Sequence, residues 1–121
     1  MLRVENVSVA YGRIIGLKEV SLVVNDGEIV TILGANGAGK TSLLNSISGA
    51  VPLKGGRVSL DQRQISGLAP HSTIRLGIAY VPEGRQIFGE MSVKDNLTMG
   101  AYTQCARKRL STVAYIGLFL H

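Results

Sequence analysis

Residues 29–44 read IVTILGANGAGKTSLL, and this stretch decides the fold of the chain. The run from Ile29 to Leu33 is β-branched or apolar without alternation, which predicts a strand buried on both faces of a parallel α/β sheet. It leads directly into residues 34–41, GANGAGKT, which match the phosphate-binding pattern G-x-x-x-x-G-K-[ST]. Apolar residues at helical spacing follow until Gly49. The stretch therefore predicts the strand, loop and helix of a P-loop in the required order.

The residue types in this loop indicate its chemistry. Its three glycines can take backbone angles that are closed to other residues. Their N–H groups, with those that open the following helix, form an anion-binding nest. Lys40 adds a positive charge for the β- and γ-phosphates, and the hydroxyl of Thr41 is placed to ligate Mg²⁺. The alternative is a glycine-rich turn that contains Lys-Thr by chance, and the flanking strand and helix patterns argue against it.

The composition indicates one folded domain. The chain has 121 residues, of which 45% are hydrophobic and 17% are charged. The N-terminus lacks the unbroken apolar stretch of a signal peptide, and no segment approaches the length of a membrane span. The single cysteine, Cys105, has no partner for an internal disulfide, which is typical of a reducing cytoplasm.

The charge distribution argues against a nucleic-acid partner. The net charge is +5, but the 13 basic residues are scattered apart from one cluster at 107–109. Nucleic-acid binders usually concentrate basic residues on one face, often with interleaved aromatic side chains. Aromatic residues make up only 5% of this chain. A nucleotide ligand and a solvated surface account for the charge.

Two strand patterns precede the P-loop. Residues 2–9 predict a strand with a change of phase near Asn6, which indicates a bulge. A turn at 11–13 leads to a second strand at 17–24, and Asn25-Asp26-Gly27 is a hairpin signal. The first 28 residues therefore predict an antiparallel β layer beside the nucleotide-binding strand.

Shorter elements follow the P-loop helix. Pro70 near the start and Gly77 at the end favour a short helix between them. Ser92-Val93-Lys94-Asp95 matches a capping box, so a helix is expected to begin near Val93. The remaining predicted elements are a strand at 57–60, a turn region at 61–69, a strand at 78–81 and a loop at 83–90.

Together these stretches resemble the nucleotide-binding subunits of ABC transporters. The resemblance is carried by Tyr11, by residues 25–49, by GGRVSLDQRQISGL at 55–68 and by IAYVPEGRQIFGEMSVKDNLTMGAY at 78–102. Within the family, GANGAGKT, YVPEGR and the Tyr-Gly-Arg of residues 11–13 look most like the subunit that serves importers of branched-chain amino acids.

The resemblance implies a truncated P-loop NTPase of the ABC type with an α/β fold. We expect an N-terminal antiparallel β layer, part of the parallel core sheet and the start of the helical subdomain. Residues 1–102 are then a partial nucleotide-binding domain. Residues 103–121 form a divergent apolar tail.

The resemblance also implies the site residues. Tyr11 holds the position of an aromatic ring that stacks on adenine, and its alternative role is to close a turn. Glu83 stands where most of the family carries a glutamine that touches Mg²⁺ and the attacking water; its alternative is an exposed loop acid beside Arg85. Lys40 and Glu83 are the expected catalytic residues, and Thr41 and Glu83 the expected metal ligands. The expected ATP contacts are Tyr11, Gly34, Asn36, Gly37, Ala38, Gly39, Lys40, Thr41 and Ser42.

Several groups that the family needs for hydrolysis are absent from these 121 residues. There is no apolar strand ending in Asp-Glu, no signature loop of the Leu-Ser-Gly-Gly-Gln type and no late histidine in context. Asp61 ends a similar run but is expected in the outer β layer. His71 and His121 are expected at the surface. A truncated or frameshifted gene is therefore one expectation.

The main functional interpretation is the N-terminal half of an ATP-binding subunit, whose intact form uses MgATP to drive branched-chain amino acid import. The implied partners are membrane permease subunits and a second ATP-binding subunit, at the cytoplasmic face of the membrane. The alternative is a non-catalytic nucleotide-binding remnant. An unrelated P-loop GTPase or kinase is disfavoured because no Asn-Lys-x-Asp motif occurs.

Two expectations concern surfaces. Residues 83–91 are expected to dock on the membrane subunit through Ile87, Phe88 and Met91, unless Phe88 packs beneath the loop. The strand at 29–33 has only 78–81 as a parallel companion in this interpretation. Its apolar face, which includes Ile29, Ile32, Ile78 and Val81, is then partly exposed, with the tail shielding part of the sheet.

Overall fold

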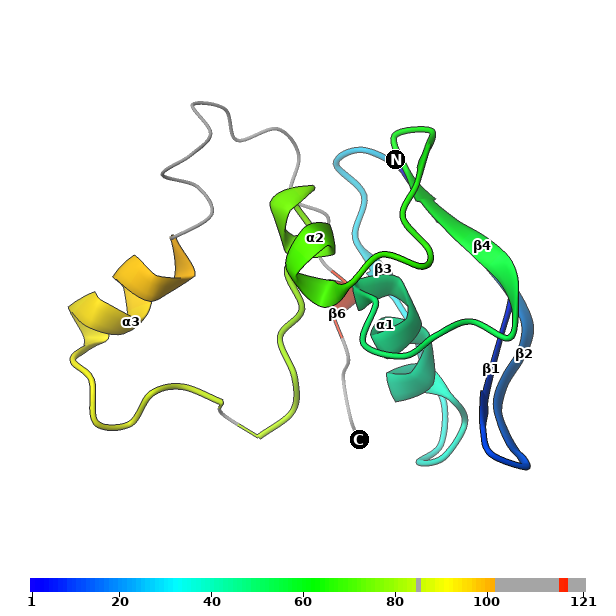
Figure 1. Ribbon diagram of the computed structural model, residues 1–121, viewed down its shortest axis with the longest axis horizontal. Coiled ribbons are helices and arrows are strands. Elements are labelled where there is room, and N and C mark those ends of the chain that lie inside the picture. Colours follow the sequence, from blue (N-terminus) through cyan, green and yellow to red (C-terminus); the bar gives the residue numbers. More distant parts are fainter. Residues whose placement is uncertain (85, 102–115, 118–121) are drawn as a thin grey trace.

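The computed structural model describes residues 1–84, 86–101 and 116–117 (Figure 1). An antiparallel sheet lies against one helix, a second helix packs beside the first, and a third stands apart from both. None of the helices within the described residues has the length and hydropathy of a membrane span. The elements in chain order are β1 Leu2–Tyr11, β2 Ile14–Val24, β3 Val30–Thr31, α1 Lys40–Ser48, β4 Gly55–Leu60, β5 Arg63–Gln64, α2 Pro70–Arg75, α3 Val93–Gly100 and β6 Ile116–Gly117.

The predicted antiparallel β layer is confirmed. Its four strands lie in the order β2-β1-β4-β5, and all neighbours are antiparallel. β5 falls inside the predicted turn region at 61–69, so that region is more regular than its sequence indicates. Asp61 lies at the turn between β4 and β5, where its carboxylate accepts from the amino group of Met1 at 2.6 Å. The expectation that Asp61 belongs to the outer layer is therefore confirmed.

The predicted bulge near Asn6 is also confirmed. Asn6 has a φ of 48°, and the pairing of β1 with β2 shifts register between Val4 and Val7. The side chain of Ser21 stabilises the bulge by accepting from the backbone N–H of Asn6 at 2.8 Å. Because the bulge changes the phase of side-chain alternation, Val4 and Val7 both point into the core, at 1% and 0% exposure.

The core forms between the sheet and α1. The apolar face of α1 supplies Leu43 and Ile47, and the sheet supplies valines and leucines at alternating positions. Burying each such side chain contributes about 1.5–3 kcal/mol. The buried apolar residues that form the cluster are Leu2, Val4, Val7, Val9, Leu17, Val24, Leu43, Ile47, Val58 and Ile65.

The C-terminus of α1 ends as its sequence predicts and is fixed to α2. Gly49 has a φ of 83°, and its N–H donates to the carbonyl of Asn45. The buried hydroxyl of Thr73 in α2 donates to the carbonyl of Ser48 at 2.7 Å. A side chain at position 49 would place its Cβ 2.5 Å from the carbonyl oxygen of Leu68. The helix end and the entry to α2 are therefore packed backbone against backbone.

The predicted strand at 78–81 was wrong. Those residues form no strand, and the parallel companion of β3 is β6, with Val30 opposite Ile116. The amide of Ile78 donates instead to the carbonyl of Thr73 at 3.2 Å. Pro82 has no N–H to donate to a neighbouring strand, which removes a ladder bond at the other end of this segment.

The burial predicted for residues 29–33 was also wrong. β3 contains only two residues, and Ile29 and Leu33 are 78% and 77% exposed. The partial exposure expected for the apolar face is confirmed at Ile29 and at Val81, which is 86% exposed. The pairing of β3 with β6 agrees with the expectation that the tail covers part of this sheet.

The hairpin predicted at 25–27 is a turn but not a hairpin. Gly27 has a φ of 73°, and the amide of Glu28 donates to the carbonyl of Asn25 at 3.1 Å. The carboxylate of Glu28 in turn accepts from the amide of Asn25 at 2.7 Å. The chain then leaves the antiparallel sheet, because β3 pairs with β6 and not with β2. The prediction of a turn at these residues is confirmed. The prediction that the strands on its two sides pair with each other was wrong.

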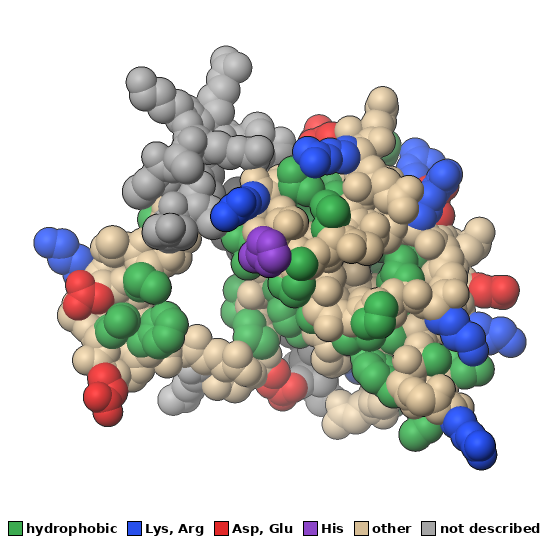
Figure 2. Space-filling view, in the orientation of Figure 1, with side chains coloured by type: hydrophobic (Ala, Val, Ile, Leu, Met, Phe, Trp, Pro, Cys, Tyr) green, Lys and Arg blue, Asp and Glu red, His purple; other side chains and the backbone are tan. Residues whose placement is uncertain are grey.

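Helix α3 begins at the predicted cap. The hydroxyl of Ser92 accepts from the amide of Asp95 at 3.1 Å. No residue of α3 is buried, and Val93 and Leu97 are 78% and 70% exposed. Figure 2 shows hydrophobic side chains on the surface of this outlying part of the molecule.

The crossing of β4 over the Asn6 bulge makes Gly56 a sensitive position. Gly56 has a φ of 81°, and a Cβ there would lie 2.3 Å from the carbonyl oxygen of Asn6. We expect Gly56→Ala to lower the free energy of unfolding by more than about 2 kcal/mol, since a left-handed φ alone costs an alanine about 1–2 kcal/mol. Urea unfolding measures the difference. Gly55→Ala is the matched control, because its Cβ would meet open space, and equal midpoints for the two variants would contradict the prediction.

The ion pair between Glu5 and Arg57 gives a pH-dependent contribution to stability. A hydrogen bond from Arg57 lowers the pKa of Glu5 below its ordinary value. A depressed carboxyl pKa stabilises the fold above the unfolded pKa, and this contribution is lost as the pH falls through the folded value. We expect NMR titration to show a higher Glu5 pKa in Arg57→Gln than in the wild type. Arg63→Gln serves as the control, and an unshifted pKa in Arg57→Gln would refute the assignment.

Candidate nucleotide-binding site

The loop between β3 and α1 has the backbone that an anion-binding nest requires. Gly37 and Gly39 have φ values of 86° and 95°, which glycine adopts without strain. The amide of Ala38 donates to the carbonyl of Ala35 at 3.1 Å, so the loop is closed by its own turn. The first N–H groups of α1 lack partners within the helix and face the loop, as at any helix N-terminus. The loop therefore presents backbone donors next to the positive end of a helix dipole.

The side chain of Lys40 is folded back over this loop. It is 7% exposed, and its Nζ donates to the carbonyl oxygens of Gly34 and Ala35, the second at 2.7 Å. A buried ammonium needs such acceptors. The positive charge is thus held inside the curve of the loop. A phosphate oxygen there would accept from the three N–H groups of the same ammonium. The structure in this way places the predicted phosphate-binding charge at the loop.

Thr41 and Ser42 occupy the first turn of α1. Thr41 is exposed, and no hydrogen bond of its hydroxyl is seen to other groups among the described residues. Within residues 1–84, 86–101 and 116–117, no group of three or more His, Cys, Asp or Glu side chains is placed to hold a metal ion. A single hydroxyl ligand suits Mg²⁺, which usually keeps several waters and takes its other ligands from substrate phosphates.

Tyr11 reaches the P-loop from the end of β1. Its hydroxyl donates to Oγ of Ser42 at 3.1 Å, which brings the predicted adenine contact to the first turn of α1. The ring is 45% exposed and lies over Gly16 of β2, where an added Cβ would be 2.6 Å from its Cε2 atom. Gly16 was not predicted as part of the site. A glycine within a strand is the signal that indicates such a close approach.

Gly16 also contacts the P-loop. A Cβ on Gly39 would lie 2.6 Å from the carbonyl oxygen of Gly16, so the backbone of β2 touches the backbone of the loop. Both glycines are therefore needed where the antiparallel sheet meets the loop. This contact fixes the position of the loop relative to Tyr11.

Glu83 is not brought into contact with the P-loop by any interaction of the described residues. Its side chain is exposed, and no hydrogen bond or ion pair of it is seen in this part of the chain. Its suggested neighbour Arg85 lies outside the described residues. The metal and water roles of Glu83 remain predictions.

The loop that follows Glu83 exposes large apolar side chains. Ile87, Phe88 and Met91 are 71%, 56% and 44% exposed. Phe88 therefore does not pack beneath the loop, and docking of this loop on a membrane subunit stays a prediction. His71 is exposed as expected, and His121 lies outside the described residues.

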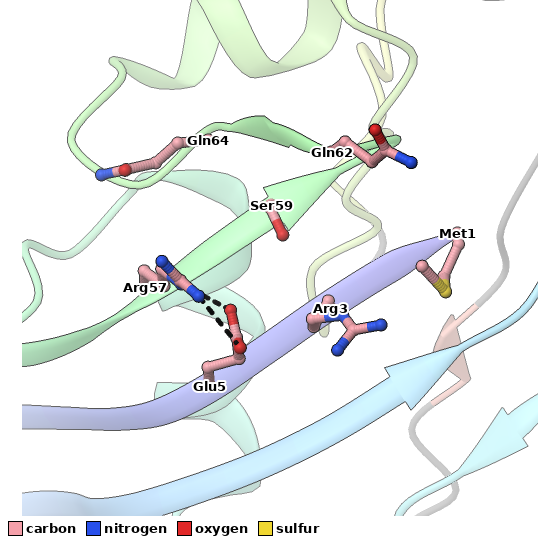
Figure 3. Close-up of a pocket in the computed structure, with 7 residues that line it drawn as sticks. All are labelled: Met1, Arg3, Glu5, Arg57, Ser59, Gln62 and Gln64. Carbon is pink, nitrogen blue, oxygen red and sulfur yellow. Dashed lines mark hydrogen bonds and ion pairs between the residues drawn. The ribbon is translucent and has the colours of Figure 1, made fainter.

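A separate hollow of about 380 Å³ lies on the outer face of the antiparallel sheet (Figure 3). It is open and polar, and Figure 3 shows Arg57 and Glu5 pointing toward each other across β4 and β1. None of the P-loop residues lines it. It is not assigned as the nucleotide site, because the residues that the sequence indicates for phosphate binding, at 34–42, do not line it.

The sequence was compared with known proteins. A profile described as ABC transporter matches residues 17–118. The chain belongs to this family. It corresponds to the ATP-binding domain of an ABC transporter, which confirms the predicted P-loop NTPase fold. The match runs past residue 102, and the predicted division into residues 1–102 and a tail at 103–121 remains a prediction.

Two curated relatives of this chain serve transporters with different substrates. BraG of Pseudomonas aeruginosa, a high-affinity branched-chain amino acid transport ATP-binding protein, is 42% identical over 102 residues, which are 84% of this chain and 44% of the relative. LptB of Escherichia coli, a lipopolysaccharide export system ATP-binding protein, is 45% identical over 97 residues, which are 79% of this chain and 40% of the relative. The chain thus spans less than half the length of either relative.

Solved structures of ATP-binding cassettes share the fold. A nucleotide-free ATP-binding cassette from an ABC transporter aligns with a TM-score of 0.76 and 31% identity, over 89% of this chain and 46% of that chain. A dimeric cassette in a post-hydrolysis state with bound ADP and Pi aligns with a TM-score of 0.76 and 25% identity, over 92% of this chain and 50% of that chain.

The contact of Gly16 with Tyr11 allows the adenine role to be tested apart from phosphate binding. We expect Gly16→Ala to displace the ring and to weaken ATP on the order of tenfold, by analogy with base stacking on aromatic side chains. Tripolyphosphate should keep its affinity, because it has no base. Calorimetric titration with both ligands measures the two effects. Tyr11→Leu should reproduce the result and Gly89→Ala should not. An equal loss for both ligands in Tyr11→Leu would reject the adenine contact; this variant decides because an added Cβ at Gly16 would also lie 3.0 Å from Oγ of Ser42.

Proposed function

We propose that this chain binds MgATP through residues 34–42 and Tyr11, as part of the ATP-binding subunit of an importer of branched-chain amino acids. The observation that carries the nucleotide site is the ammonium of Lys40 held inside a loop that contains two left-handed glycines and ends in a helix N-terminus. This combination of charge, backbone donors and helix dipole is suited to a polyphosphate.

Each part of the site then has one task. The loop amides from Gly34 to Gly39 hold the phosphates, and Lys40 exchanges its carbonyl acceptors for β- and γ-phosphate oxygens. The hydroxyl of Thr41 would hold Mg²⁺, which would offset the negative charge of the phosphates. Tyr11 orients the base, and its bond to Ser42 ties the adenine side of the site to the phosphate side.

The relatives support two candidates for the transported substrate. BraG supports import of branched-chain amino acids, while LptB supports a role in lipopolysaccharide export. The motif resemblance noted in the sequence favours the importer. Identification of the membrane subunit that copurifies with the chain decides between them, and an export subunit would overturn the importer assignment.

The proposed partners are membrane permease subunits and a second ATP-binding subunit, at the cytoplasmic face of the membrane. The dimeric cassette that shares this fold supports the second subunit. The exposed side chains of Ile87 and Phe88 support a docking surface on the loop after Glu83. Glu83 itself is proposed to approach Mg²⁺ when nucleotide is bound.

We expect binding without hydrolysis from these 121 residues. Phosphoryl transfer depends on positioning and electrostatic stabilisation, and the sequence has no Asp-Glu pair and no signature loop to supply them. The alternative interpretation as a non-catalytic remnant predicts the same result in isolation. The two interpretations differ in whether a membrane partner is bound.

Replacing Lys40 tests the proposal. Lys40→Met keeps the aliphatic stem and removes the charge, and we expect at least about tenfold weaker ATP binding because charged hydrogen bonds contribute about 1.5–3 kcal/mol. Titration calorimetry measures affinity, and phosphate release measures turnover. Lys54→Ala is the control for a change in net charge. Wild-type affinity in Lys40→Met, or steady phosphate release that the substitution abolishes, would contradict the proposal of binding without hydrolysis.

A further inference from the structure

The loop before α3 is held by one side chain, that of Asn96. Its Oδ1 atom accepts from the amide of Phe88 at 3.0 Å, and its Nδ2 atom donates to the carbonyl of Phe88 at 3.1 Å. The same Nδ2 atom also lies 3.3 Å from the carbonyl oxygen of Met91 and 3.0 Å from that of Ser92. The carboxamide thus pairs with Phe88 as a neighbouring strand would, and it also contacts the residues that lead into the helix.

Only a carboxamide can make this set of contacts. It offers one acceptor to an N–H and two N–H donors to carbonyls from a single planar group. An ionised carboxylate of the same shape can still accept from the amide of Phe88. It has no N–H or O–H to donate to the carbonyl oxygens of Phe88, Met91 and Ser92. An alanine leaves the amide of Phe88 and the carbonyl of Met91 without these bonds, while the carbonyls of Phe88 and Ser92 keep the backbone amides of Met91 and Asn96 as donors. The position therefore requires a carboxamide, and an ionised carboxylate of the same size cannot replace it.

The segment that Asn96 holds is the one that exposes the apolar side chains. Phe88 and Met91 are its direct partners, and Ile87 is the neighbour of Phe88. Hydrophobic packing from α3 does little to hold this loop, because no residue of α3 is buried. Among the described residues, the restraints on the loop are the side-chain hydrogen bonds from Asn96 and one backbone bond from the amide of Met91 to the carbonyl of Phe88 at 3.1 Å.

We propose that Asn96 is a positioning residue that fixes the shape of residues 88–92 and so presents Ile87 and Phe88 as a preformed surface for the membrane subunit. The docking part of this inference rests on the proposed function. A preformed surface binds more tightly than a loop that must be ordered on binding, because less conformational entropy is lost. Asn96 then controls docking without touching nucleotide.

Amide hydrogen exchange of the 121-residue chain tests the positioning role. In Asn96→Ala the Phe88 amide loses its acceptor, and we expect its protection to fall about tenfold or more. In Asn96→Asp the ionised carboxylate keeps the acceptor for the Phe88 amide but has no donor for the carbonyls of Phe88, Met91 and Ser92, so the loop loosens; a protonated carboxyl group regains one donor, and protection should therefore depend on pH. Protection should therefore recover as the pH falls through the pKa of the new carboxyl group. The wild type and Asn96→Ala should show no such recovery after correction for intrinsic exchange.

The control is Thr98→Ala, which removes a side-chain bond within α3 between Thr98 and Lys94 and leaves the loop contacts intact. Protection of Phe88 should be unchanged in this variant, and amides of α1 should be unchanged in all three. Unaltered Phe88 protection in Asn96→Ala, or pH-independent protection in Asn96→Asp, overturns the inference. ATP affinity should match the wild type in every variant. Failure of ATP binding in the wild type would instead reject the proposed nucleotide site and leave the exchange result standing.

Discussion

The backbone contact between Gly16 and Gly39 is the constraint on which the site depends. It brings β2 against the P-loop with no side chain between them, and the same glycine gives the ring of Tyr11 a place to lie. The antiparallel sheet, the phosphate loop and the proposed adenine contact are therefore positioned by one close approach. The core between β1 and α1 holds the backbones of β2 and the P-loop at this short distance.

The sequence predicted the parts of the fold that local chemistry determines. The P-loop, the bulge at Asn6 and the cap at Ser92 each depend on a few adjacent residues, and the structure contains all three. The strand at 78–81 and the hairpin at 25–27 depended on which distant segment would pair. Local patterns do not carry that information, and Ile78 bonds to Thr73 instead. The failures thus lie in pairing and not in turn or cap chemistry.

The same division applies to the candidate site. Residue type and spacing indicate Lys40 and Thr41, because phosphate and Mg²⁺ require those groups. Gly16 and Asn96 have no motif, and their roles follow only from what lies against them in space. Sequence motifs indicate the residues that contact a ligand more readily than the residues that position them. Both kinds are needed for a preorganised site.

The pairing of β3 with β6 has a consequence for the order of folding. β1 and β2 are joined by a tight turn, so their contacts are local and can form early. Val30 pairs with Ile116, and nearly the whole intervening chain must be in place before this contact can close. During synthesis the antiparallel layer can therefore assemble while the strand that leads into the P-loop still lacks its neighbour. The nucleotide loop lies at the junction of an early unit and a late one, and the strand that leads into it gains its neighbour only after residues 116–117 have been synthesised.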